Sequence, residues 1–121
     1  IISKDFLVEY PTGGSNICNK RKELEDLKIL YPKVIFEIEK KPIWTKEDET
    51  KKNLNSRIDD ALDWIGNRKE KEIAIVGHMT FLNAMTNNTI LTQNNNFKHC
   101  YPYKFIAKYS MYNKCLDIRQ I

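Results

Sequence analysis

A histidine that follows an apolar run is the first candidate for chemistry in this sequence. His78 comes directly after Ile73-Ala74-Ile75-Val76-Gly77, and an apolar pattern with helical spacing begins just behind it, over residues 80–85. The run predicts a strand covered on both faces, and Gly77 allows a sharp exit from it. In an open α/β sheet, anionic ligands usually bind where such a strand ends and a helix begins. A histidine there either acts on a ligand or is simply a packed, hydrogen-bonded side chain.

Three further charged side chains could serve the same chemistry. Glu9 ends a short apolar segment, and taken alone it is typical of a surface carboxylate. Lys20 and Arg21 stand at the start of a predicted helix. They could bind the anionic group of a substrate, because guanidinium in particular suits bidentate contacts with oxygen. The alternative is a solvated charge cluster with Lys22.

Glu49 and Arg57 lie eight positions apart on one predicted helix. Their side chains therefore point in directions that differ by about 80°. Either each of them meets the site or they meet each other, and a structural ion pair is the favoured interpretation. Cys18, His99 and Cys100 lack the spacing of zinc ligands, so no metal site is predicted.

The elements that must position these residues alternate between strands and helices. Apolar residues at positions 1–2 and 6–8 predict a first strand, and the composition of residues 11–16 predicts a loop. A helix is expected over residues 20–30, and Pro32 prevents it from continuing further. A short apolar segment follows at residues 34–36.

The strongest helical pattern covers residues 46–67. Thr45 and Asp48 have the spacing of a capping box, and Gly66 with Asn67 suits the C-terminal end. An apolar stripe predicts the face that meets the core, with Leu54, Ile58, Ala61, Leu62 and Ile65 as its members. After the helix at 81–85, residues 86–96 predict a loop or a continuation of that helix to Leu91. Two closing strands are expected at 104–109 and 111–118, in an uncertain register.

Length and composition restrict the class of protein. The 121 residues form one domain at most, and 20 Lys and Arg against 16 Asp and Glu give a net charge of +4 that is spread along the chain. This charge suits a small anionic substrate, whereas the clustered stripe typical of nucleic-acid binding is missing. No stretch has the length of a membrane span, and three distant cysteines argue against a disulfide scaffold. We therefore expect a cytoplasmic protein with no nucleic-acid or membrane partner.

One ordered set of residues covers most of the chain, over about residues 5–85. It consists of Glu9, Cys18-Asn19-Lys20-Arg21, Tyr31-Pro32…Phe36, Trp44…Glu49-Thr50…Arg57, Trp64-Ile65…Arg68 and Ile73-Ala74-Ile75-Val76-Gly77-His78. This order resembles that of the histidine phosphatase superfamily, and most closely that of the phosphoglycerate mutase-like phosphatases of eukaryotes.

The resemblance implies a three-layer α/β sandwich whose mostly parallel sheet is flanked by helices. It also implies phosphoryl transfer through a phosphohistidine, as hydrolysis of a phosphomonoester or as mutase transfer. His78 would stabilise the transferring phosphoryl group and Glu9 would act as proton donor and then as base. Lys20 and Arg21 would anchor a phosphorylated small molecule or phosphoprotein. No metal or organic cofactor is implied, although a mutase would need a phosphorylated primer.

The sequence departs from the family at the nucleophile. It contains no Arg-His-Gly motif, Met79 replaces a glycine that often follows the second histidine, and His99-Cys100-Tyr101 stands in place of Asn-Cys-Glu. We expect a domain truncated at its N-terminus, which by itself is inactive. A catalytically inactive relative that binds a phosphorylated ligand or a protein is the alternative. A missing neighbour would leave the 73–76 strand open to pairing, so a homodimer or aggregation of the 121-residue chain is also expected.

Overall fold

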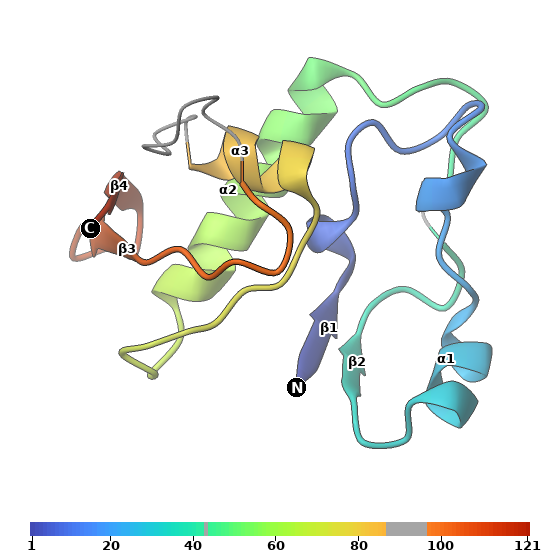
Figure 1. The fold of residues 1–121 in the computed structure, drawn as a ribbon, viewed down its shortest axis with the longest axis horizontal. Coiled ribbons are helices and arrows are strands. Elements are labelled where there is room, and N and C mark those ends of the chain that lie inside the picture. The colour runs from blue at the N-terminus through green and yellow to red at the C-terminus, as the bar shows by residue number, and fades with distance from the viewer. Residues whose placement is uncertain (43, 87–96) are drawn as a thin grey trace.

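The computed structural model describes residues 1–42, 44–86 and 97–121 as a mixed α/β chain. Strands and helices follow one another in the first half, and two strands close the chain (Figure 1). The order of elements is β1 (Ile2–Lys4), the 3₁₀ turns η1 (Asp5–Leu7) and η2 (Ile17–Asn19), α1 (Leu24–Leu30), β2 (Ile35–Glu37), α2 (Lys51–Gly66), α3 (Met79–Met85), β3 (Phe105–Tyr109) and β4 (Cys115–Gln120).

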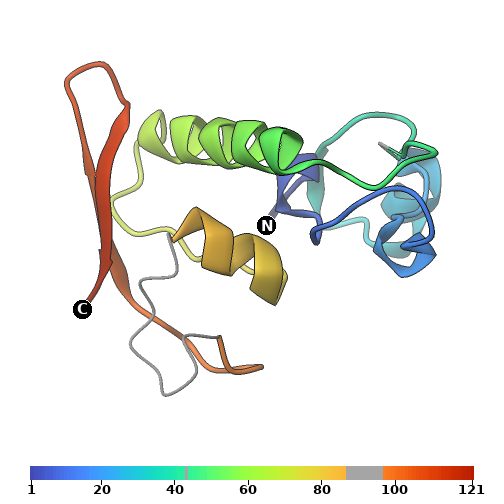
Figure 2. The same ribbon diagram turned by 90° about the horizontal axis from the view of Figure 1, so that it is seen from above.

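The strands form two separate sheets of two strands each. β1 pairs in parallel with β2, with Ile2 opposite Ile35, and β3 pairs antiparallel with β4. Figures 1 and 2 show α2 and α3 between these two sheets, so the sheets lie toward opposite ends of the molecule. The mixed α/β class is confirmed, whereas the three-layer sandwich with a mostly parallel sheet is not, because β1–β2 is the one parallel pair among the described residues.

The strand predicted at residues 73–76 is not formed. This segment carries neither helix nor strand, and Val76 is 89% exposed, although Ile75 packs against the core. β-propensity describes how well a side chain fits a pleated surface, while the strand itself requires hydrogen bonds to a neighbour. None of the described strands pairs with residues 73–76, so the apolar run stays without a sheet.

Both helices in the first half begin later than predicted. The η2 turn and an extended Lys20 precede α1, which starts at Leu24. α2 starts at Lys51, and its N-cap is Thr50, whose hydroxyl accepts a hydrogen bond from the Asn53 N–H at 3.2 Å. The capping box at Thr45 and Asp48 was therefore wrong, while the end at Gly66 with Asn67 as C-cap is confirmed.

The segment around Thr45 is held by a loop instead of starting a helix. Gly13 forms an isolated β-bridge with Asp48, and the Gly14 N–H donates to the Thr45 carbonyl at 3.0 Å. Gly13 has a φ of +94°, and a Cβ there would lie 2.3 Å from the Glu47 carbonyl oxygen. Only glycine permits this approach, so a long-range contact prevails over the local capping signal.

The core lies between α2 and α3. Leu54 and Ala61 of α2 are buried against Phe81 and Met85 of α3, as the apolar stripe of the longer helix predicted. Partly buried side chains complete it, among them Phe6, Leu7, Ile58, Leu62 and Ile75. This packing fixes the first turn of α3 against the chain that leaves η1, which is where Glu9 lies.

The two closing strands are confirmed, with a shifted second boundary. β3 and β4 pair through a ladder that runs from Phe105 opposite Gln120 to Tyr109 opposite Cys115, with an irregularity between Lys108 and Tyr109. The positions from 111 to 114, predicted as strand, form the turn between them. The loop or helix predicted after Thr86 lies outside the described residues. No helix in the described ranges is long and apolar enough to cross a membrane.

Candidate active site

The Glu9 side chain lies at the N-terminal end of α3, where it meets Phe81, 72 positions further along the sequence. One carboxylate oxygen, Oε1, accepts hydrogen bonds from the N–H groups of Tyr10 at 2.8 Å and Phe81 at 3.1 Å. The other, Oε2, accepts from the Thr80 N–H at 3.4 Å. The first N–H groups of a helix have no partner within it, and the positive end of the helix dipole favours a negative charge there. Glu9 therefore caps α3 from a distant segment.

His78 is the N-cap residue of α3 and stands beside the same carboxylate. Its Nδ1 lies 4.0 Å from Glu9 Oε2, and its side chain is 62% exposed, against 18% for Glu9. Its own side chain makes no capping hydrogen bond. The structure thus brings together the imidazole and the carboxylate that the sequence singled out. An anionic ligand was expected where this helix begins, but the N–H groups of Thr80 and Phe81 already donate to the Glu9 carboxylate.

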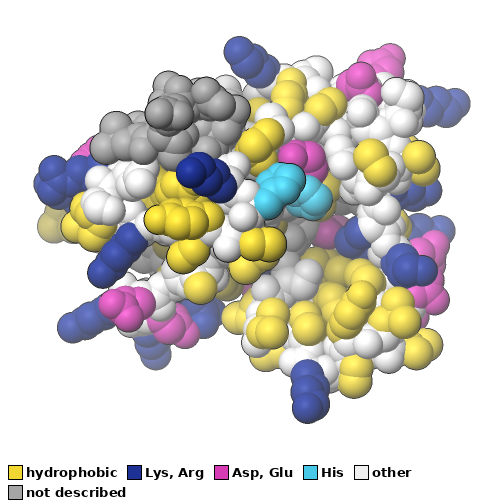
Figure 3. All heavy atoms as spheres, in the orientation of Figure 1, with side chains coloured by type: hydrophobic (Ala, Val, Ile, Leu, Met, Phe, Trp, Pro, Cys, Tyr) yellow, Lys and Arg dark blue, Asp and Glu magenta, His cyan; other side chains and the backbone are white. Residues whose placement is uncertain are grey.

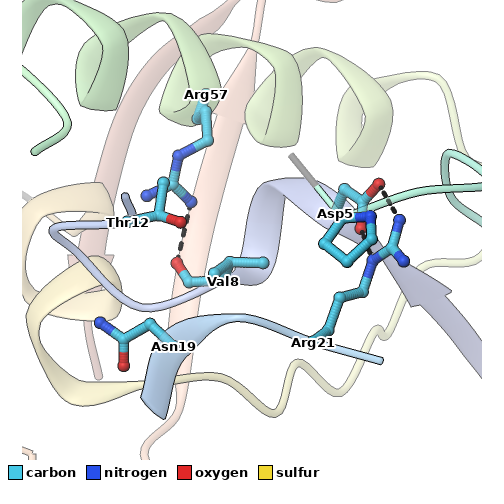
Figure 4. A pocket seen from close by; sticks show the side chains of 7 residues that line it. Asp5, Val8, Thr12, Asn19, Arg21 and Arg57 are labelled. Atoms are coloured by element: carbon cyan, nitrogen blue, oxygen red, sulfur yellow. Dashed lines mark hydrogen bonds and ion pairs between the residues drawn. The ribbon is translucent and has the colours of Figure 1, made fainter. Parts of the chain in front are cut away.

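Glu49 and Arg57 meet each other, as the favoured interpretation predicted. Arg57 Nε lies 2.6 Å from Glu49 Oε1, and Nη2 lies 2.7 Å from Oε2, so the pair is bidentate. The side chains are 15% and 4% exposed for Arg57 and Glu49, respectively. The guanidinium also donates hydrogen bonds to the main chain just before Glu9, at the carbonyls of Phe6 and Val8. Figure 4 shows Arg57 reaching from α2 toward Val8.

Arg21 is engaged by partners that the sequence did not indicate. Its Nε and Nη2 bind the two carboxylate oxygens of Asp5 at 2.6 and 3.0 Å, as Figure 4 shows. Nη2 also donates to the carbonyls of Glu39 at 2.6 Å and Lys41 at 3.1 Å. The guanidinium therefore joins η1 to the loop after β2 and does not form a solvated cluster with Lys22. Asp5 carries no local signal for this role, because its partner lies 16 positions away.

Lys20 lies in an open groove beside this junction. The groove is lined by both signs of charge, from Lys20, Arg21, Lys22, Glu23, Asp26 and Lys41, together with Pro42 and Trp44. The Lys20 ammonium nitrogen is 6.0 Å from the centre of the Trp44 ring, within the range of a cation–π contact. Of the two predicted anchors, Lys20 is exposed and able to meet a ligand, whereas Arg21 is committed to Asp5.

Comparison with known proteins gives three related proteins from Arabidopsis thaliana. They are phosphoglycerate mutase-like protein 1, which is 39% identical over 82 residues, a phosphoglycerate mutase-like protein at 33% over 78 residues, and phosphoglycerate mutase-like protein 2 at 31% over 87 residues. The matches cover 61%, 61% and 69% of this chain.

The chain spans less than a third of each relative, namely 29%, 29% and 24% of their lengths. No family model matches the chain, and no solved structure is significantly similar to it. The three relatives share one description, phosphoglycerate mutase-like. The matched part of this chain is therefore similar to phosphoglycerate mutase-like proteins.

Proposed function

We propose that this chain supplies part of a phosphoryl-transfer site of the phosphoglycerate mutase-like histidine phosphatase type. The reaction would be hydrolysis of a phosphomonoester or mutase transfer through a phosphohistidine. The observation that carries the proposal is the meeting of His78 Nδ1 and Glu9 Oε2 at 4.0 Å. The names of the three relatives support the same class of protein.

In this proposal the two side chains divide the work. The exposed imidazole of His78 donates a hydrogen bond and, when protonated, a positive charge to the oxygens of the transferring phosphoryl group. Glu9 moves a proton to the leaving oxygen and then accepts one from the attacking water. The hydrogen bonds from the backbone of α3 hold Glu9 in place, so its carboxylate needs no rearrangement before the proton moves.

The nucleophile and the complete sheet belong to the same proposal. The 121 residues contain no Arg-His-Gly motif, and the relatives are more than three times as long as the parts that match. We propose that the nucleophilic histidine comes from another stretch of the whole protein. There, residues 73–76 would pair with a further strand, as part of a mostly parallel sheet flanked by helices.

The substrate in this proposal is a phosphorylated small molecule or a phosphoprotein. Lys20 would bind its anionic group from the groove beside Trp44, since the ammonium is exposed there. Arg21 would hold the main chain beside Lys20 in place through its ion pair with Asp5. Its own contact with the substrate would therefore be less direct than that of Lys20.

The test measures turnover of the whole protein with p-nitrophenyl phosphate and with phosphoglycerates, together with trapping of a phosphohistidine. Loss of a positioned acid–base group or of a charge-stabilising donor lowers turnover by roughly 10²–10⁴-fold, so we expect reductions of that order for His78→Ala and Glu9→Gln. His99→Ala is the matched control, because His99 is an exposed histidine in a turn and has no role in the proposed site.

Unchanged turnover in His78→Ala would remove His78 from the mechanism. A wild-type protein without turnover that still binds phosphorylated ligands would instead identify an inactive binding relative, the alternative considered from the sequence. One set of measurements thereby distinguishes a catalytic protein from one that only binds phosphorylated ligands.

A further inference from the structure

We propose that Arg57, with Glu49, is a positioning residue that holds Glu9 against α3 so that its carboxylate stays beside His78. This inference rests on the proposed function for the role of Glu9, and on contacts within the structure for the role of Arg57. Arg57 and Glu49 act through the main chain on both sides of Glu9 and through the Phe81 ring.

The first contact fixes the chain just before Glu9. Arg57 Nη1 donates hydrogen bonds to the carbonyl oxygens of Phe6 and Val8, both at 2.8 Å. The Val8 carbonyl belongs to the planar peptide unit that carries the nitrogen of Glu9. Holding this oxygen therefore limits rotation of the backbone from which the Glu9 side chain departs.

The second contact fixes the chain just after Glu9. Glu49, bound on both oxygens by Arg57, accepts a hydrogen bond from the Thr12 N–H at 3.3 Å. The Glu49 N–H donates in turn to the Thr12 carbonyl at 2.7 Å. The segment that carries Glu9 is thus held at Val8 and at Thr12 by one ion pair.

The third contact reaches the helix that Glu9 caps. The guanidinium carbon of Arg57 lies 4.9 Å from the centre of the Phe81 ring, and the Phe81 side chain is fully buried. The N–H of the same Phe81 donates to Glu9 Oε1 at 3.1 Å. Arg57 therefore contacts the main chain beside Glu9 and also Phe81, the α3 residue whose N–H donates to Glu9.

The choice of arginine fits a positioning role. Its planar fork offers five donors in fixed directions, so it can bind a carboxylate and two carbonyls together, whereas an ammonium is a compact point charge. A buried ion pair contributes little net stability compared with apolar residues of similar size, because both charges must leave water. Its geometry, rather than its charge alone, is the property that the local structure uses.

The decisive variant is Arg57→Lys in the whole protein. Lysine leaves a positive charge beside Glu49 but cannot keep all four oxygen contacts, so the fold should persist while Glu9 loosens. Small misplacements of a reacting group can cost about 10²-fold in rate, so we expect kcat to fall roughly 10- to 100-fold while KM changes less than about threefold. Arg68→Lys is the matched control, since Arg68 pairs with Glu70 at the surface and lies 4.9 Å from the Trp64 ring centre.

A second readout needs no activity. Hydrogen exchange at the amides of Thr80 and Phe81 reports their hydrogen bonds to Glu9. We expect faster exchange at these two amides in Arg57→Lys, with exchange at the buried Ala61 unchanged. Wild-type kcat together with wild-type exchange at Thr80 and Phe81 would overturn the inference.

The outcomes separate this inference from the proposed function. Wild-type kcat and wild-type exchange in Arg57→Lys, beside an inactive His78→Ala protein, reject the role of Arg57 and leave the proposed function standing. A wild-type protein without turnover rejects the proposed function, while the exchange measurement still decides whether Arg57 holds Glu9. Should Arg57→Lys melt below the assay temperature, Glu49→Gln replaces it with the same two readouts. Unchanged kcat and exchange in that variant would overturn the inference.

Discussion

At the scale of single residues, the structure joins groups that are distant in sequence through charged hydrogen bonds. Glu9 satisfies backbone donors of α3, Arg57 holds carbonyls near Glu9, and Arg21 binds Asp5. Charge-assisted hydrogen bonds are shorter and stronger than neutral ones, and these contacts include several at 2.6 to 2.8 Å. The candidate site is therefore built on a small number of specific polar contacts.

Tyr109 provides a prediction at this scale. Its hydroxyl donates to the Leu62 carbonyl at 3.1 Å, and burial, together with the nearby Cys115 thiol, raises the pKa of the phenol from 10.0 to about 12. The folded state then keeps the proton over a pH range in which the unfolded state has lost it. The contribution of Tyr109 to stability is present below pH 10 and is lost as the pH rises toward about 12.

Thermal melting of the wild type and of Tyr109→Phe measures this effect between about pH 9 and about pH 12, a range that includes both pKa values of the phenol. We expect the melting temperature of the wild type to fall more steeply with pH than that of the variant. Parallel curves would show that the phenol is ionised equally in the folded and unfolded states.

At the scale of elements, α2 is the scaffold of the molecule. One face of this helix forms the core with α3, and the same helix carries Arg57 to the segment around Glu9. Near the C-terminal end of α2, the Leu62 carbonyl accepts a hydrogen bond from the Tyr109 hydroxyl, and Asp63 pairs with the side chain of Lys114. The N-terminal end of α2 depends on Thr50, which makes the capping interaction a sensitive point.

We predict that Thr50→Ala destabilises the protein by about 1 kcal/mol, because an N-cap hydroxyl satisfies an otherwise unpaired N–H of the first turn. Urea denaturation, compared at a constant m-value, measures the difference in the free energy of unfolding. Thr45→Ala is the matched control, because the Thr45 hydroxyl donates to the Glu47 carbonyl and caps no helix. A larger loss for Thr45→Ala than for Thr50→Ala would contradict the assignment of the cap.

At the scale of the whole molecule, the core is small and much apolar surface stays exposed. In the described residues the core cluster consists of Leu54, Ala61, Phe81 and Met85 with a partly buried surround. Figure 3 shows apolar side chains gathered over the region of β1, β2 and α1. Ile1 is 93% and Val76 is 89% exposed, and both two-stranded sheets leave strand edges unpaired within the described chain.

We therefore predict that the 121-residue chain alone self-associates or aggregates, because unpaired apolar edges can pair between molecules. Light scattering coupled to size-exclusion chromatography measures the mass as a function of concentration. Val76→Lys, which places a charge on the exposed segment, should reduce the association. A monodisperse monomer of the wild-type chain that melts cooperatively would contradict the prediction.

The features that could be predicted from the sequence depend on neighbouring residues. The apolar stripe of α2, its end at Gly66 and Asn67, and the two closing strands follow from periodicity and turn chemistry, which act over a few positions. The match to family order also indicated Glu9 and His78, although nothing in local pattern would have placed them 4.0 Å apart.

The amino-acid sequence by itself determined the helical faces, the mixed α/β class and the relation to phosphoglycerate mutase-like proteins. Only the tertiary structure decided that Thr50 rather than Thr45 caps α2, that Arg21 binds Asp5, and that residues 73–76 form no strand. The reason is physical: a helix closes its hydrogen bonds within four residues, whereas a strand, a cap on a distant helix and an ion pair each need a partner that folding must bring to them.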